Sequence, residues 1–106
     1  MDKTINTTFE CYRVCLETKK YCLEKGGEHA NPQHIQLLAD CIELCKMSAH
    51  FMIAGSSLHG KVCGICAEAC RKCAESCEGM GEDEMMKKCA EICRRCEEEC
   101  KNMASM

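Results

Sequence analysis

The sequence has little of what usually builds a protein core. Its 106 residues include no tryptophan, one proline, two tyrosines and two phenylalanines. Leucine, isoleucine, valine and phenylalanine together number only 16, too few for a purely aliphatic core. Apolar and polar residues do not alternate over any length, so strands are not expected. Something besides ordinary apolar packing must fill the interior.

Long apolar runs and an excess of positive charge are missing as well. No stretch approaches the ~18 apolar residues of a membrane span, and residues 1–8 hold no apolar core of a secretory signal. The formal charge is −3 without a basic stripe, so the electrostatic footprint of nucleic-acid binding is absent. We therefore expect a cytoplasmic protein that binds neither membrane nor nucleic acid.

Glycine and serine clusters divide the chain into four segments of similar length. The breaks lie at Gly26-Gly27, Gly55-Ser56-Ser57 and Gly79-Met80-Gly81. Gly26 and Gly79 are expected in the left-handed conformation that often follows a helix. The breaks predict helices near residues 4–25, 32–54, 58–78 and 82–103. Short connections between helices of similar length predict an all-α fold, an up-down antiparallel four-helix bundle formed by one domain over residues 1–106.

Fourteen cysteines recur along these segments at steps that are almost all three or four residues. Such steps keep side chains within an arc of about 80° on one helix face. The same register, the inward-facing seam of the bundle, is completed by Thr18, His34, Leu38, Ser48, Met52, His59 and Met86. The cysteines are Cys11, Cys15, Cys22, Cys41, Cys45, Cys63, Cys66, Cys70, Cys73, Cys77, Cys89, Cys93, Cys96 and Cys100.

An internal repeat supports this pattern in the second half of the chain. Residues 66–77 (CAEACRKCAESC) and 89–100 (CAEICRRCEEEC) match at eight of twelve positions. The thiols thus occupy positions that leucine fills in an ordinary bundle. A single buried cysteine is usually a small hydrophobe, but fourteen in register would leave the seam underpacked. A metal-filled interior removes that difficulty, and all fourteen are candidate ligands.

The charge of the loaded core favours Cu(I) as the metal, with several ions per chain. One monovalent copper per thiolate is neutral, and soft sulfur selects it, whereas four thiolates around one divalent zinc leave two negative charges. A zinc-binding bundle and a thiol-rich bundle held by disulfides remain alternatives. The cysteine spacing does not match ferredoxin-type iron–sulfur ligation. No Cys–His constellation indicates an assembled nucleophile, so we do not expect an enzyme.

The two ends of the bundle differ in composition. One should be plugged by apolar residues, namely Phe9, Phe51, Met52, Ile53, Leu58, Val62 and Met103. The other gathers small, polar and weakly coordinating residues, including His29, His34 and Met86, and we expect copper to pass there. His34 is the leading auxiliary ligand outside the cysteines, and His59, Met52 and Met86 are weaker candidates.

The cysteine pattern resembles the bacterial copper storage proteins over nearly the whole chain. The resemblance rests on six C-x3-C pairs, extended by Cys22 and Cys63: Cys11/Cys15, Cys41/Cys45, Cys66/Cys70, Cys73/Cys77, Cys89/Cys93 and Cys96/Cys100. It implies reversible storage of many Cu(I) ions in the core, homotetramers and a cytosolic form. The sequence departs from the family at Thr18 and Ser48, which stand where thiols could lie, and it has no histidine in the last connection.

Overall fold

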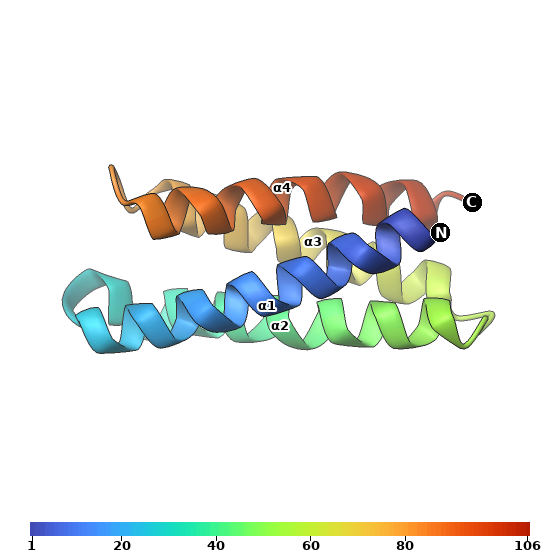
Figure 1. Ribbon diagram of the computed structural model, residues 1–106, viewed down its shortest axis with the longest axis horizontal. Helices are drawn as coiled ribbons and strands as arrows, with labels where there is room; N and C mark the ends of the chain where they lie inside the picture. The colour runs from blue at the N-terminus through green and yellow to red at the C-terminus, as the bar shows by residue number, and fades with distance from the viewer.

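Four helices follow one another along the chain in the computed structural model, which describes residues 1–106. Their ends lie within two residues of the predicted positions. The helices are α1 (Asp2–Lys25), α2 (Pro32–Ile53), α3 (His59–Glu78) and α4 (Glu84–Ala104), with a short 3-10 helix, η1 (Gly27–Ala30), after α1. They form an antiparallel up-down bundle measuring 42 × 19 × 18 Å (Figure 1). The predicted all-α bundle is confirmed.

Two hairpins, α1–α2 and α3–α4, make up the bundle, and its two ends are built differently. The connections within the hairpins, residues 26–31 and 79–83, lie at one end, which we call the two-loop end (Figure 1). The connection between α2 and α3 lies at the other, the terminal end, together with both chain termini. A molecule or ion can therefore reach the core only through one of these ends, or between two helices that have moved apart.

Side-chain caps set the starts of α2 and α4. The Asn31 Oδ1 accepts a hydrogen bond from the Gln33 amide at 2.9 Å, and Pro32 follows at the first helical position. Asp83 Oδ1 accepts from the amides of Met85 and Met86 at 2.9 and 3.2 Å. The left-handed conformation expected at Gly79 is wrong: its φ is −75°, because the chain continues in a helical turn, and φ becomes positive at Gly81.

Cysteine fills the core in place of leucine. All fourteen cysteine side chains are 0–1% exposed, and the predicted seam is buried from Thr18 and His34 to Met52 and Met86. The Thr18 hydroxyl donates to the Val14 carbonyl oxygen at 2.7 Å, which satisfies it within its own helix. His59 is the exception in the seam, because it lies half-buried at the start of α3.

The apolar plug expected at the terminal end is largely wrong. Phe9, Ile53 and Leu58 are 47%, 61% and 52% exposed, because their register turns them away from the bundle axis. Of the predicted set, Met52 and Met103 are buried. The terminal end is therefore closed not by aromatic residues but by Met52 and Met103 together with three buried threonines of α1, Thr4, Thr7 and Thr8.

Candidate metal centre

Ten of the cysteines form a continuous array along the bundle axis, which we call the thiol ladder. It consists of four groups of four cysteines, and within each group all Sγ atoms lie within 4.8 Å of one another. Neighbouring groups share two members, so the groups overlap instead of forming separate sites. From the two-loop end they are Cys15/Cys73/Cys89/Cys93, Cys11/Cys15/Cys41/Cys93, Cys11/Cys41/Cys45/Cys70 and Cys45/Cys66/Cys70/Cys96.

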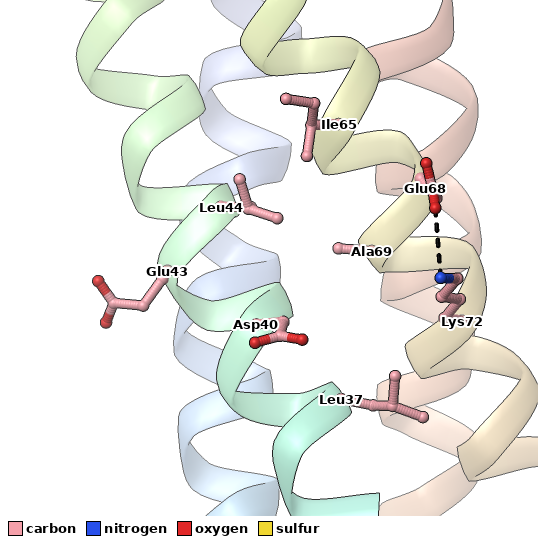
Figure 2. Close-up of a pocket in the computed structure, with 8 residues that line it drawn as sticks. All are labelled: Leu37, Asp40, Glu43, Leu44, Ile65, Glu68, Ala69 and Lys72. Atoms are coloured by element: carbon pink, nitrogen blue, oxygen red, sulfur yellow. Dashed lines mark ion pairs between the residues drawn. The ribbon is translucent and has the colours of Figure 1, made fainter. Parts of the chain in front are cut away.

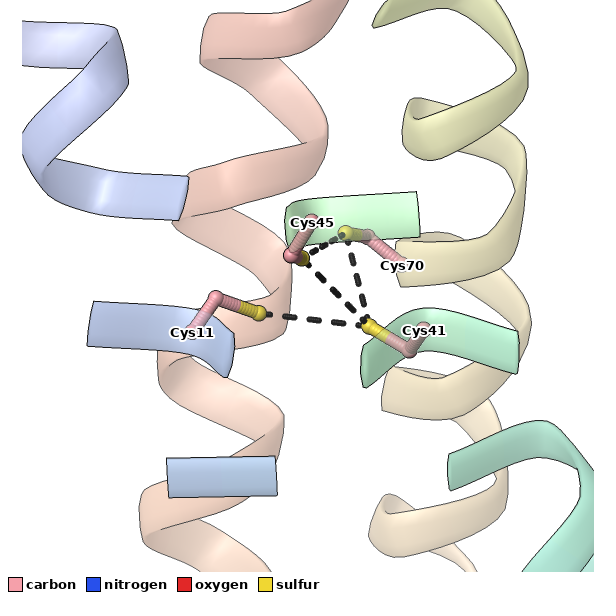
Figure 3. A group of neighbouring side chains, drawn as sticks. All are labelled: Cys11, Cys41, Cys45 and Cys70. Carbon is pink, nitrogen blue, oxygen red and sulfur yellow. Dashed lines mark hydrogen bonds between the residues drawn. The ribbon is translucent and has the colours of Figure 1, made fainter. Parts of the chain in front are cut away.

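The third group shows how the ladder is assembled from different helices (Figure 3). Cys11 comes from α1, Cys41 and Cys45 lie one turn apart on α2, and Cys70 comes from α3. The Sγ atom of Cys41 lies 3.9 Å from that of Cys11, 4.0 Å from that of Cys45 and 3.6 Å from that of Cys70. Sulfurs bound to one tetrahedral ion at ~2.3 Å lie ~3.8 Å apart. The three distances are close to this value, so the sulfurs could bind a shared ion with little movement.

The remaining four cysteines extend the ladder at its two ends. Cys22 and Cys77 lie toward the two-loop end, and Cys63 and Cys100 lie toward the terminal end. None belongs to a four-cysteine group, although all are buried. The structure thus brings all fourteen predicted cysteines to one interior, ten in shared groups and four as extensions.

A mixed cluster of sulfur and nitrogen lies where the ladder meets the two-loop end. The Cys22 Sγ atom lies 3.5 Å from the Nε2 atom of His34 and 4.0 Å from the Sδ atom of Met86. Ser76 Oγ lies 2.6 Å from His34 Nδ1. When the serine oxygen accepts from Nδ1–H, the Nε2 lone pair faces the cysteine, which is the orientation that a metal ligand needs.

Burial keeps both groups of this cluster uncharged. It raises the pKa of the Cys22 thiol to about 11 and lowers the pKa of His34. At neutral pH a protonated thiol therefore faces a neutral imidazole. A metal ion bound here must displace the thiol proton.

Hydrogen bonds between thiols distribute protons unevenly within the ladder. Hydrogen bonding with Cys11 and Cys15 holds the pKa of Cys41 well below its usual value. Hydrogen bonding with Cys11 and Cys41, together with burial, raises the pKa of Cys45 well above that value. Donor and acceptor thiols are thus mixed within one network, and a negative charge in it is shared with neighbouring S–H groups.

The other auxiliary residues lie at the terminal end. Met52 is 2% exposed and packs in the core, whereas His59 Nδ1 lies 2.9 Å from the Ser56 carbonyl oxygen and is engaged by the backbone. Ser48 is fully buried, and its Oγ atom has no hydrogen-bond partner. A polar group close to it is the Cys63 thiol, whose pKa is lowered by hydrogen bonding with Cys100 and, to a smaller extent, by the Ser48 hydroxyl.

A sequence model of the copper storage protein family matches residues 1–105. The chain belongs to the copper storage protein family. The match explains why cysteine fills the seam, because thiols are the ligands that hold soft copper ions.

Solved structures agree with this membership. A crystal structure of a Nitrosospira multiformis protein is 42% identical, with a TM-score of 0.91 over 99% of this chain and 98% of that one. The Cu(I)-bound copper storage protein of Bacillus subtilis is 27% identical, with a TM-score of 0.90 over 97% and 96% of the two chains. Its apo form gives 27% identity and a TM-score of 0.87 over 97% of each chain. None of the curated protein sequences matches.

Three residues beside this copper storage core were not predicted as site residues: Tyr21, Asp83 and Ser76. Tyr21 directly precedes Cys22, and Ser76 directly precedes Cys77. This adjacency to a seam cysteine is the only feature of the sequence that could have indicated a role for either residue. Asp83 stands at the start of a predicted helix, where an acidic residue already has a capping role. No helix of this family member is both long and apolar enough to cross a membrane.

Proposed function

We propose that this chain stores several Cu(I) ions as thiolate complexes inside its bundle, as one domain over residues 1–106, in the cytoplasm and without catalysing a reaction. The observation that carries the proposal is the thiol ladder, ten buried thiols in four overlapping groups. Overlap suits an ion that accepts few ligands and shares sulfur atoms. It does not suit ions that each need four ligands of their own.

Charge distinguishes copper from zinc in this core. The buried residues include no lysine or arginine that could balance thiolate charge. A zinc ion with four thiolates leaves two negative charges in a medium where unpaired charge is costly. Cu(I) bound at one ion per thiolate leaves none. The buried composition therefore supports copper over the zinc alternative.

The ligands that we propose are the fourteen cysteines, with His34 and Met86 as auxiliary ligands at the two-loop end. The contacts of Cys22 with both residues support this assignment. Met52 is a thioether within the core at the terminal end and a weaker candidate. His59 is the weakest candidate, because its imidazole, held at Nδ1 by the Ser56 carbonyl oxygen, makes no hydrogen bond to a cysteine sulfur as His34 does.

Homotetramers, which the family resemblance implies, would need apolar outer faces. One candidate is a pocket of about 290 Å³ between α2 and α3, in which Leu37, Leu44, Ile65 and Ala69 are flanked by Asp40, Glu43, Glu68 and Lys72 (Figure 2). Another is the outer face of α1, where Phe9, Leu16 and Leu23 are exposed at intervals of seven residues. Both faces support contacts between copies of the chain.

An anaerobic Cu(I) titration of the reduced protein against a chromophoric chelator tests the storage function. The mass of the loaded species then gives the number of ions bound. The ladder predicts about ten or more ions before the chelator competes. Uptake of one ion or none would reject storage. Titration of free thiols before loading tests the disulfide alternative, and competition with zinc tests the zinc alternative.

A further inference from the structure

The thiol core is closed at the surface, so copper cannot reach it without a local opening. All fourteen cysteine side chains are 0–1% exposed, and Met86 and His34 are 0% and 3% exposed. An ion that enters or leaves must wait for part of the bundle to separate. The contacts that resist this separation therefore control exchange.

One polar cluster joins the two hairpins at the two-loop end. Tyr21 Oη donates to Asp83 Oδ2 at 2.8 Å, and His29 Nε2 lies 3.1 Å from the same oxygen. The Tyr21 and His29 rings also meet edge to face, with centroids 6.0 Å apart. Asp83 therefore ties α1 and η1 of the first hairpin to the start of α4 in the second.

This cluster lies directly beside the soft donors of the two-loop end. Tyr21 precedes Cys22 in the chain, and the second carboxylate oxygen of Asp83 binds the amide of Met86. The His29 and Asp83 side chains are only 15% and 14% exposed, so solvent screens their contact less than that of a surface pair. Separation of residues 26–31 from 79–83 would first break these bonds and then uncover Cys22.

We propose that Tyr21, His29 and Asp83 form a latch that holds the two-loop end shut and sets the rate at which Cu(I) enters and leaves the core. This proposal rests on the proposed storage function for its copper rates. His29 lies among the weakly coordinating residues of this end, but its Nε2 atom is engaged by Asp83 and it is not one of the proposed ligands. Loss of the latch therefore leaves the number of ions unchanged. The latch acts on exchange because the open state must form before any thiol is reached.

The test uses Tyr21→Phe combined with His29→Ala, which removes both bonds to Asp83 and leaves the helix cap intact. Glu10→Gln is the matched control, because the Glu10–Arg95 ion pair also joins α1 and α4, at 2.7 Å, but is exposed and lies away from the loops. Two rates are measured: reaction of the apo-protein thiols with Ellman's reagent, and removal of Cu(I) from the loaded protein by excess chelator.

The double variant should react and release copper about tenfold faster than the wild type, with unchanged capacity. That change corresponds to about 1.4 kcal/mol, close to the contribution of a single hydrogen bond to a charged group and therefore a lower bound for the loss of two. The control should exchange at the wild-type rate. Unchanged rates in the double variant, or equal acceleration in the control, would overturn the latch.

One further measurement and the choice of readout keep the test decisive. Circular dichroism verifies that the double variant folds, and if it does not, Tyr21→Phe alone replaces it, with an expected acceleration of about threefold. The reaction with Ellman's reagent needs no copper. If the wild type binds no Cu(I), storage fails, and the thiol rates still decide whether the latch exists.

Discussion

The two hairpins of the bundle contribute different types of buried side chain to one core. The α3–α4 hairpin carries nine of the fourteen cysteines, and its other buried residues are mainly alanines with Ile92, Met86 and Met103. The α1–α2 hairpin carries five cysteines and adds Val14, Leu38 and Ile42. One hairpin is packed in part by ordinary apolar side chains, and the other depends much more on its thiols. Metal should therefore matter most to the order of α3–α4.

The largest expected effect is stabilisation by copper, concentrated in α3–α4. A ligand that binds only the folded state at a thousand times its Kd adds about 4 kcal/mol per site. Hydrogen exchange of the apo and loaded proteins should show a greater gain in protection for α3 and α4 than for α1 and α2. An equal gain in protection in both hairpins would show that the larger number of cysteines in α3–α4 does not make that hairpin depend more on copper for its stability.

Cysteines shared between groups should matter more to capacity than cysteines outside the groups. Cys41 belongs to two groups of the ladder and Cys77 to none. Cys41→Ala should therefore lower the Cu(I) stoichiometry by more than one ion, and Cys77→Ala by about one. Mass determination of the loaded variants measures both. Equal losses would indicate independent sites instead of an overlapping ladder.

A new thiol in α1–α2 should increase the share of that hairpin in Cu(I) binding and so reduce its difference from α3–α4. Ser48→Cys places a thiol at a fully buried seam position and should raise the number of bound Cu(I) ions by about one. Ser48→Ala is the control, and the number of bound Cu(I) ions should not change. The free energy of unfolding of the apo-protein should rise by about 1 kcal/mol, because the variant removes a buried hydroxyl that has no hydrogen-bond partner. A Ser48→Cys variant with wild-type capacity would place this position outside the copper channel.

The smallest expected effect concerns the contact between the hairpins at Asp83. The hydrogen bond from Tyr21 lowers the pKa of the Asp83 carboxyl. Because the pKa is lower in the folded state, the stabilisation is present above the usual aspartate pKa and is lost as pH falls through the folded value. Asp83→Asn keeps a capping side chain without the charge.

Urea unfolding of the apo-protein checks this prediction. The wild type should exceed Asp83→Asn in stability by less than about 1 kcal/mol at pH 5, and the difference should shrink as pH falls below the usual aspartate pKa. A difference that persists unchanged in acid would assign the effect to capping rather than to the charged carboxylate.

Helix geometry explains which features could be predicted from the sequence. Steps of three and four residues place side chains on one helix face whatever the surroundings, so the seam from Cys11 to Cys100 and the bundle itself were predictable. The caps at Asn31 and Asp83 are local signals of the same kind. Gly79 was assigned wrongly because a helical turn continues through it.

Features that depend on how helices sit against one another were not predictable. The sharing of Cys11 and Cys41 between groups depends on the axial stagger of α1 and α2, which residue spacing does not encode. The predicted burial of Phe9 and Ile53 was wrong, because each helix is oriented so that its cysteines face the bundle axis, which leaves these two side chains exposed. Tyr21 and Asp83 meet only once both hairpins are in place.

The most direct test of the central claim is a crystal structure of the loaded protein with anomalous data collected at the copper absorption edge. The account predicts several copper peaks along the bundle axis between the ladder thiols, with one near Cys22, His34 and Met86. Copper confined to surface histidines and carboxylates, with an empty thiol core, would contradict it.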